Sequence, residues 1–291
     1  MRKPDLSIVV VTYQIKRQAS RTLRSLARDY QRGLAGIDYD VLVVDNGSPD
    51  PLPESALADL DGNFRLHRLD PAPSSPAYAA NLGVSLTQGQ RVCVILDGAR
   101  MVTPGLIARG VQATQLHRRP IVTTMAWHLG PEHQSLSVPK GYGPEAEEAL
   151  LARIGWPADG YRLFEISALA AANPGGFFGS VNESCCLLLP RALWDEVGGF
   201  DERFDVAGGG LVSLDLFARL VALPDSQLVV LLGEGSFHQV HDRAATGPSA
   251  DPAAWHAQYE ALRGGPYLHP QIQPVYYGAL PRPAHRWLTP A

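Results

Sequence analysis

The sequence predicts an α/β fold in which a mostly parallel sheet lies between two layers of helices. Apolar, β-branched segments alternate with segments of helical periodicity over the first hundred residues, which is typical of a parallel sheet with helices on both faces. The apolar segments are nearly continuous, as expected for strands that are buried on both faces. Acidic residues follow two of these strands, at the end where open α/β sheets bind ligands.

The first hundred residues contain four predicted strands, and a predicted helix separates each strand from the next. The strands are expected at residues 6–11, 41–44, 64–69 and 91–96. The helices are expected at residues 18–31, 55–60 and 77–86. The first helix places Leu23, Leu26, Ala27 and Tyr30 on one face, which we expect to be buried against the sheet.

The rest of the chain is less regular. Helices are expected at residues 104–117, 144–154, 191–197, 213–223 and 253–262, and strands at residues 121–125, 184–189 and 228–232. Residues 127–180 are rich in glycine and proline, and we interpret them as a binding region because long irregular segments are often binding loops. We expect one domain over residues 1–242 and a C-terminal extension over residues 243–291.

Composition excludes several classes of protein. The net charge of −4 gives no support for a nucleic-acid partner, which usually needs a basic face. Cys93, Cys185 and Cys186 are odd in number, and we interpret them as structural thiols of a reducing compartment. The apolar segment near the N-terminus is too short for a signal peptide, and no segment approaches the ~20 apolar residues of a transmembrane helix. We therefore expect a cytoplasmic protein without a transmembrane segment.

Two common phosphate-binding motifs are missing. The first strand is followed by Thr12-Tyr13-Gln14-Ile15 and not by G-x-G-x-x-G, which counts against a dinucleotide-binding domain. The P-loop motif G-x-x-x-x-G-K-[ST] does not occur either. The strands are followed instead by Asp45 and Asp97. Since Gly98 would let a ligand approach the backbone, Asp97 is a candidate metal or phosphate position, and its alternative is a turn residue before Gly98.

Five segments resemble the family 2 glycosyltransferases of GT-A fold, in the order in which that family carries them. They are residues 7–13, 43–48, 80–83, 96–97 and 198–204. Each segment is a weak signal alone, but the five together are specific. The resemblance implies a GT-A fold and an inverting hexosyltransferase. Such an enzyme moves a sugar from a UDP-, GDP- or dTDP-linked donor to an acceptor hydroxyl on a glycan or small molecule, usually with Mn²⁺ or Mg²⁺.

The resemblance places the nucleotide beside Thr12, Tyr13, Asp45 and Asn81. In the family, the residue that matches Asp45 binds the nucleotide, as acidic residues bind ribose in other nucleotide folds. The alternative for Asp45 is a turn-forming role beside Asn46. Thr12 and Tyr13 would line the same pocket, and their alternative is packing at the end of the strand.

The metal site is expected at Asp97, which matches the first carboxylate of the family's Asp-x-Asp motif. Hard cations prefer oxygen ligands, but the second acidic position is Ala99, so one ligand is missing. Arg100 could contact a phosphate or could be a solvated surface charge. His238 or His241 could replace the missing ligand, as a histidine does in related glycosyltransferases. Because these two would not share a face of an extended segment, we prefer His238, whose alternative is a histidine satisfied by local hydrogen bonds.

The family's catalytic base has no direct counterpart. Val212 and Ser213 stand where the family has a Glu-Asp pair, so Asp215 is the predicted base. The alternative for Asp215 is an intrahelical ion pair with Arg219. The glycines at residues 208–210 would let an acceptor approach closely or let the loop move as a lid. Two other acidic residues are further candidates for the base, Glu183 and Glu234.

Three functions remain open at this point. A metal-assisted glycosyltransferase is the leading hypothesis, with residues 127–180 on the acceptor side. A non-catalytic protein that binds sugar nucleotides or glycans is the second, because acids are missing at positions 99, 212 and 213. A sugar-1-phosphate nucleotidylyltransferase is the third, although the basic glycine-rich loop of that class is missing. The C-terminal extension could fold over the site or form a contact in a homodimer.

Overall fold

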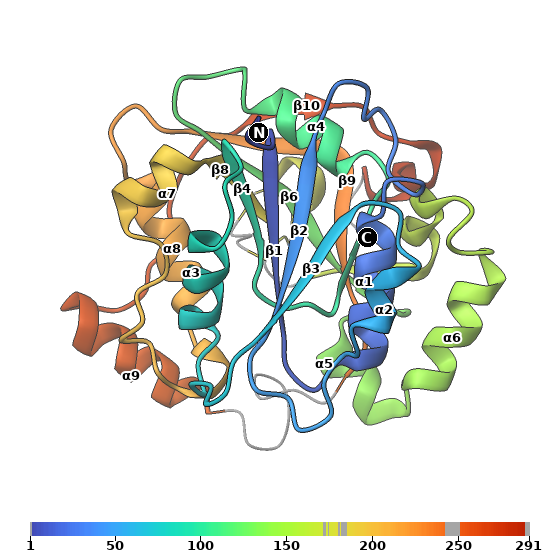
Figure 1. Cartoon of the computed structure of the whole chain (residues 1–291), viewed down its shortest axis with the longest axis horizontal. Coiled ribbons are helices and arrows are strands. Elements are labelled where there is room, and N and C mark those ends of the chain that lie inside the picture. The colour runs from blue at the N-terminus through green and yellow to red at the C-terminus, as the bar shows by residue number, and fades with distance from the viewer. Residues whose placement is uncertain are drawn as a thin grey trace.

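The structure, a computed structural model, describes residues 2–170, 173, 175–179, 181, 185–241 and 251–288. Its described residues form one sheet of ten strands in the order β10-β9-β6-β8-β4-β1-β2-β3, with β5 paired to β9 and β7 paired to β6. Helices lie on both faces of this sheet (Figure 1). The predicted α/β fold with a mostly parallel sheet is therefore confirmed.

The strands are β1 (Leu6–Thr12), β2 (Tyr39–Asp45), β3 (Asn63–Arg68), β4 (Arg91–Ile95), β5 (Arg100–Val102), β6 (Pro120–Leu129), β7 (Ser167–Leu169), β8 (Leu187–Pro190), β9 (Gln227–His238) and β10 (Val275–Gly278). The α-helices are α1 (Lys16–Leu26), α2 (Ser55–Ala58), α3 (Ala77–Ser85), α4 (Leu106–Ala113), α5 (Gln134–Ser137), α6 (Pro144–Arg153), α7 (Arg191–Val197), α8 (Val212–Val221) and α9 (Pro252–Arg263). The 3-10 helices are η1 (Val138–Lys140), η2 (Gly160–Ile166), η3 (Gly176–Phe178), η4 (Ala207–Gly209) and η5 (Arg282–Trp287).

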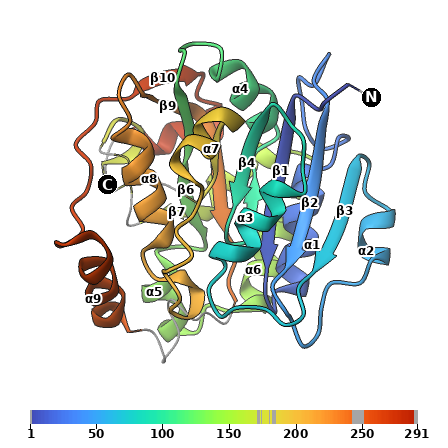
Figure 2. The same cartoon turned by 60° about the vertical axis from the view of Figure 1, so that its left-hand side comes forward.

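The central strands bury both of their faces, which explains their continuous apolar sequence. Strands β1, β2, β3 and β4 run parallel, and β8 runs antiparallel to its neighbours β4 and β6. Alternate side chains of β1 point to opposite faces: Val9 and Val11 pack with α3, α7 and α8, whereas Ile8 and Val10 pack with α1 and α4. Figure 2 shows α3 and α7 in front of the sheet and α1 behind it.

Several elements differ in length from the prediction, among them α1, β8 and β9. Helix α1 ends at Leu26 because Ala27 takes an extended conformation, although Tyr30 is buried as expected. Strand β8 begins at Leu187, and the predicted start at Ser184 lies outside the described residues. Strand β9 runs on to His238, whereas its glycines suggested an end near residue 232. An irregularity in its pairing with β6 takes up Gly233, whose φ is +76°.

The irregular region between residues 127 and 180 packs around Trp127. The Trp127 ring lies 5.2 Å from that of Phe164 and 5.1 Å from that of Trp287, measured between centroids. Phe177 and Phe237 complete the buried group. A large aromatic cluster of this kind contributes several kcal/mol through burial, at about 1.5–3 kcal/mol per buried side chain. It holds together a segment that consists of short helices, α5, α6 and η1 to η3, and the short strand β7.

The described part of the C-terminal extension packs on the same sheet as the rest of the chain. Strand β10 pairs with β9, and Trp287 of η5 joins the aromatic cluster around Trp127. On the opposite face, Arg263 at the end of α9 donates to Asp201 at 2.8 Å and to Asp215 at 2.6 Å. The division at residue 242 stays a prediction. No helix in the described ranges has the length and apolar character that crossing a bilayer requires.

We predict that Arg263→Met destabilises the protein by about 1–3 kcal/mol, because it removes one of two arginines from a buried carboxylate. The control is Arg203→Met, since Arg203 also binds Asp201 but its side chain is 65% exposed, and it should cost less than about 1 kcal/mol. Urea unfolding gives both free energies. Equal losses in the two variants would show that α9 is not held by this ion pair.

Candidate functional site

Three central strands end side by side at the edge where the site was expected. Thr12 at the end of β1 pairs in register with Asp45 at the end of β2, and β4 lies on the other side of β1. Asp97 follows β4 by two residues, and Gly98 donates its N–H to the carbonyl of Val11 at 2.9 Å. A Cβ on Gly98 would lie 2.6 Å from that carbonyl oxygen. Glycine is therefore required for the turn that holds Asp97 against β1.

The packing around Ala99 explains why the second acidic position is lost. Ala99 is fully buried and packs with Ile15 and Ala19 of α1. A carboxylate at this position would be transferred into an apolar contact, at a cost of several kcal/mol if it stayed charged and unpaired. In this chain, position 99 belongs to the contact between α1 and the sheet, and the second ligand must come from elsewhere.

Asp97, His238 and His241 form a compact cluster. The Asp97 Oδ2 atom lies 2.9 Å from His238 Nε2, and Asp97 Oδ1 lies 3.7 Å from His241 Nε2. The two Nε2 atoms are 3.2 Å apart, and all candidate ligand atoms lie within 4.8 Å of one another. The expectation that His238 and His241 would not share a face is wrong, because β9 ends at His238 and the chain turns there.

Buried polar groups from two helices hold this turn. Val240, between the two histidines, donates its N–H to Glu147 of α6 at 2.6 Å. Its carbonyl accepts a hydrogen bond from Gln18 of α1 at 2.7 Å. Glu147 is fully buried and accepts from Arg21 at 3.0 Å; burial nevertheless raises the pKa of Glu147. These residues were missed because their sequence positions carry no motif.

The charges around Asp97 favour its ionised form. Burial acts to raise the pKa of Asp97, but His238, His241 and Arg100 outweigh it and hold that pKa well below its ordinary value. Arg100 lies opposite His238 in the β5–β9 pair, with its Nε 3.9 Å from Asp97 Oδ2. Because Arg100 is buried, the alternative of a solvated surface charge is wrong.

The cluster fits a divalent metal ion. It offers one carboxylate and two imidazoles, and the Asp97 side chain is 34% exposed, so a ligand can reach it. Two imidazoles with one carboxylate suit first-row transition ions better than Mg²⁺, which prefers oxygen ligands. The residues that would hold the ion are Asp97, His238 and His241.

Polar groups at the ends of β1 and β2 could bind a nucleoside. Thr12 and Asn46 are buried, and Thr12 Oγ1 and Asn46 Oδ1 have no hydrogen-bond partner within the described part of the chain. Asp45 accepts from the Ser48 N–H at 2.8 Å, so its turn-forming role is present. Tyr13 is exposed beside them. Asn46 was considered only as a turn residue, and its buried oxygen could not be deduced from sequence.

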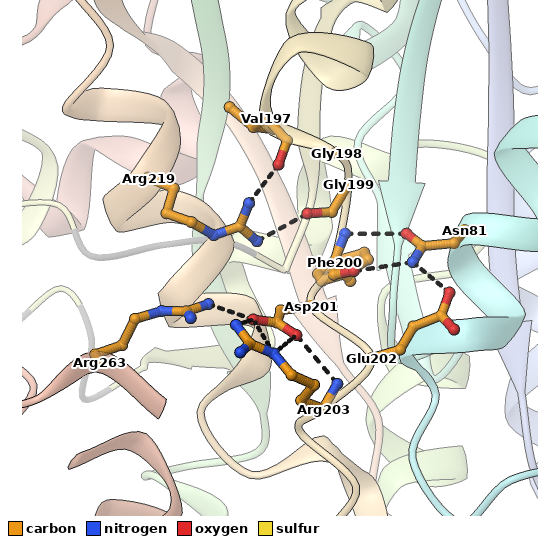
Figure 3. A pocket seen from close by; sticks show the side chains of 10 residues that line it. All are labelled: Asn81, Val197, Gly198, Gly199, Phe200, Asp201, Glu202, Arg203, Arg219 and Arg263. Carbon is orange, nitrogen blue, oxygen red and sulfur yellow. Dashed lines mark hydrogen bonds and ion pairs between the residues drawn. The ribbon is translucent and has the colours of Figure 1, made fainter. Parts of the chain in front are cut away.

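The structure places Asn81 in a different setting, a hollow of about 740 Å³ lined by polar residues (Figure 3). Its side chain donates to the carbonyl of Phe200 at 2.9 Å and to Glu202 at 2.8 Å, and it accepts from the Phe200 N–H at 2.9 Å. Asn81 therefore fixes the loop after α7. Its assignment to the nucleotide stays a prediction.

Asp215 is 1% exposed and is not among the residues that line this hollow, but it contacts two arginines that do, Arg219 and Arg263. It accepts from Arg219 at 2.8 Å and from Arg263 at 2.6 Å. Figure 3 shows Arg219 reaching past the hollow to the carbonyls of Val197 and Gly199. This is the ion pair named above as the structural alternative, so the assignment of Asp215 as base stays a prediction without geometric support.

The two other candidates for the base fare differently. Glu183 lies outside the described residues. Glu234 of β9 is buried beside Gly105, the N-cap of α4, and accepts from Thr103 and, at 3.0 Å, from Tyr161. It precedes His238 by four strand residues, a separation of about 13 Å along β9. Burial raises the pKa of Glu234 to about 7, against hydrogen bonds that lower it.

Comparison with known proteins gives one family and a set of similar folds. Residues 7–144 match the model of glycosyl transferase family 2. No curated protein matches the sequence.

Three solved structures that resemble the chain are distant in sequence. S. aureus TarS has a TM-score of 0.53 at 13% identity, over 88% of this chain and 42% of that one. TarS 1-349 in complex with UDP-GlcNAc has a TM-score of 0.52 at 12% identity, over 89% and 65%. Mannosyltransferase PcManGT from Pyrobaculum calidifontis, in complex with GDP-Man and Mn²⁺, has a TM-score of 0.50 at 18% identity, over 91% and 66%. These likenesses confirm the GT-A fold. The chain spans less than half the length of the TarS chain.

We predict that Glu234 makes the protein less stable as pH rises from about 5 to 7.5. The carboxyl keeps its proton to a higher pH in the folded state than in the unfolded state. As pH rises, the unfolded state therefore loses its proton first, and the free energy of unfolding decreases. The effect is roughly 2 kcal/mol. Urea unfolding of wild type and Glu234→Gln should show their stability difference shifting by this amount in favour of the variant as pH rises.

Glu196→Gln is the control, because Glu196 is 44% exposed in its pair with Arg119 and should give a difference that does not change with pH. A pH-independent difference for Glu234→Gln would contradict the raised pKa.

Proposed function

We propose, from the match of residues 7–144 to glycosyl transferase family 2, that the protein transfers a hexose from a nucleoside-diphosphate sugar to an acceptor hydroxyl, with inversion, beside Asp97. The observation that carries the proposal is the cluster of Asp97, His238 and His241 at the edge where β1, β2 and β4 end. Ligands of open α/β sheets bind at this edge.

Asp97, His238 and His241 would hold a divalent ion. When bound, such an ion neutralises charge on the departing nucleoside diphosphate. Arg100 places a buried positive charge beside the same carboxylate and would contact a phosphate oxygen. The two imidazoles support Mn²⁺ over Mg²⁺. A structural neighbour that binds Mn²⁺ adds to this support.

The nucleoside would bind beside Thr12, Asp45 and Asn46, with Tyr13 next to them. The buried Oγ1 of Thr12 and Oδ1 of Asn46 would gain hydrogen bonds from a base or ribose, which offsets the cost of leaving them unpaired. Similar folds bind UDP-GlcNAc and GDP-Man, so a uridine or guanosine diphosphate sugar is the first class of donor to test.

A sugar-nucleotide-binding protein without transferase activity is the second candidate. It is favoured by the acceptor side of the site, where Val212 occupies a family base position as a buried core residue. Asp215, the substitute, has arginines on both oxygens.

We predict that Asp97→Asn lowers turnover of the sugar nucleotide at least 100-fold, because it weakens the metal site and removes its one carboxylate. Stability should fall as well, because Asp97 pairs with buried His238 and Arg100, so turnover is compared under conditions where urea unfolding shows both proteins folded. Turnover is measured with UDP-GlcNAc and GDP-Man in Mn²⁺, with hydrolysis as the readout without acceptor. Asp50→Asn, on an 82% exposed side chain, is the control.

The same samples separate the two candidates. Thermal-shift measurements with each sugar nucleotide, with and without Mn²⁺, detect binding because a ligand of the native state raises stability. Binding that needs Asp97, together with no turnover on any acceptor, would establish the non-catalytic protein. Wild-type turnover by Asp97→Asn would refute both.

A further inference from the structure

We propose that Gln134 is a positioning residue that presents His238 to the metal ion through Nε2. The inference rests on the metal site of the proposed function and concerns a residue that belongs to none of the family segments. Gln134 begins helix α5, just after β6, and its side chain is buried beside the end of β9. Its partner His238 is also fully buried, so the orientation of both side chains is fixed by protein contacts.

The hydrogen bonds of Gln134 determine which way its amide points. Its Nε2 group donates to the backbone carbonyl of His238 at 3.0 Å and to that of Leu129 at 3.2 Å. A carbonyl oxygen only accepts hydrogen bonds, so the amide NH₂ must face these two groups. The Oε1 atom therefore faces His238 Nδ1, at 2.9 Å.

The amide orientation in turn fixes the role of each His238 nitrogen in the metal-bound state. An amide oxygen is an acceptor, so Nδ1 carries a proton and donates it to Gln134. The neutral ring then has its lone pair on Nε2, which lies 2.9 Å from Asp97 Oδ2 and 3.2 Å from His241 Nε2. A metal ion binds imidazole through the nitrogen that carries no proton, and the hydrogen bond of the other nitrogen sets the tautomer.

Gln134 also joins the end of β6 to the end of β9, the strand that carries His238. The hydrogen bonds described above connect the end of β6 to both the backbone and the ring of His238. They therefore fix the orientation of the ring as well as its tautomer. Its neutral amide orients the imidazole without adding a second negative charge next to Asp97.

The experiment measures Mn²⁺ binding to the metal-free protein by calorimetry, without sugar nucleotide. Gln134→Leu keeps the size of the side chain and removes its acceptor, and we expect a 10–100-fold weaker dissociation constant. Gln134→Glu keeps an acceptor for Nδ1, so it should bind Mn²⁺ within threefold of wild type even if it is less stable.

Gln31→Leu is the matched control. Gln31 is as buried as Gln134 and donates to two backbone carbonyls, those of Ser25 and Thr103, but it belongs to another part of the fold. It should lose stability and keep wild-type Mn²⁺ affinity. The pattern of the three variants separates loss of a metal-positioning contact from general loosening of the core.

A spectroscopic readout tests the tautomer itself. In Zn²⁺-loaded protein labelled with ¹⁵N-histidine, long-range proton–nitrogen spectra should show His238 protonated at Nδ1 and bound to metal through Nε2. Binding through Nδ1, or equal Mn²⁺ affinity in Gln134→Leu and wild type, would overturn the inference and leave the transferase proposal intact. Absence of Mn²⁺ binding by wild type would overturn the metal site and this inference together.

Discussion

The end of strand β9 depends on a buried hydrogen bond between Glu147 and the backbone of Val240. Strand pairing alone would carry the chain onward after His238, with alternate side chains on opposite faces. Instead, Glu147 accepts a hydrogen bond from the N–H of Val240, and Gln18 donates one to its carbonyl. These two bonds hold the chain in a turn. As a result His241 returns to the same carboxylate as His238. The site is therefore formed by contacts between α1, α6 and β9.

The same turn accounts for the departure from the family's metal motif. Helix α1 packs so closely on the sheet that position 99 has become part of its apolar contact. In the proposed metal site, the turn held by α1 and α6 would supply an imidazole where the motif has a carboxylate. The packing of Ala99 on α1 and the hydrogen bond of Val240 to Glu147 thus have a joint effect. The expected consequence is a site that prefers an ion with more affinity for nitrogen ligands. In the proposed site, Gln134 would in addition fix the orientation of the His238 ring.

The sequence was most informative where one strand determines its own environment. The continuous apolar segments predicted β1, β2 and β4, and the position of Asp97 just beyond β4 followed from them. His241 could not be placed, because its position depends on Glu147, which lies more than ninety residues away. The full length of β9 was missed for a similar reason: Gly233 reads as a turn, but pairing with β6 absorbs it as an irregularity. Asp215 shows the reverse case. Its position relative to the family motif suggested a catalytic base, whereas its hydrogen bonds to Arg219 and Arg263 indicate a structural role.

Strand β10 has a consequence for how this protein would tolerate being shortened. It lies at the margin of the sheet, where it occupies hydrogen-bonding groups of β9 over residues 275–278. A chain that stopped after residue 242 would leave that row of groups, flanked by apolar side chains, open to any other extended polypeptide. Self-association into sheet-rich aggregates is the expected outcome of such a truncation. Strand β10 therefore protects the protein from aggregation along β9, the strand that also carries His238.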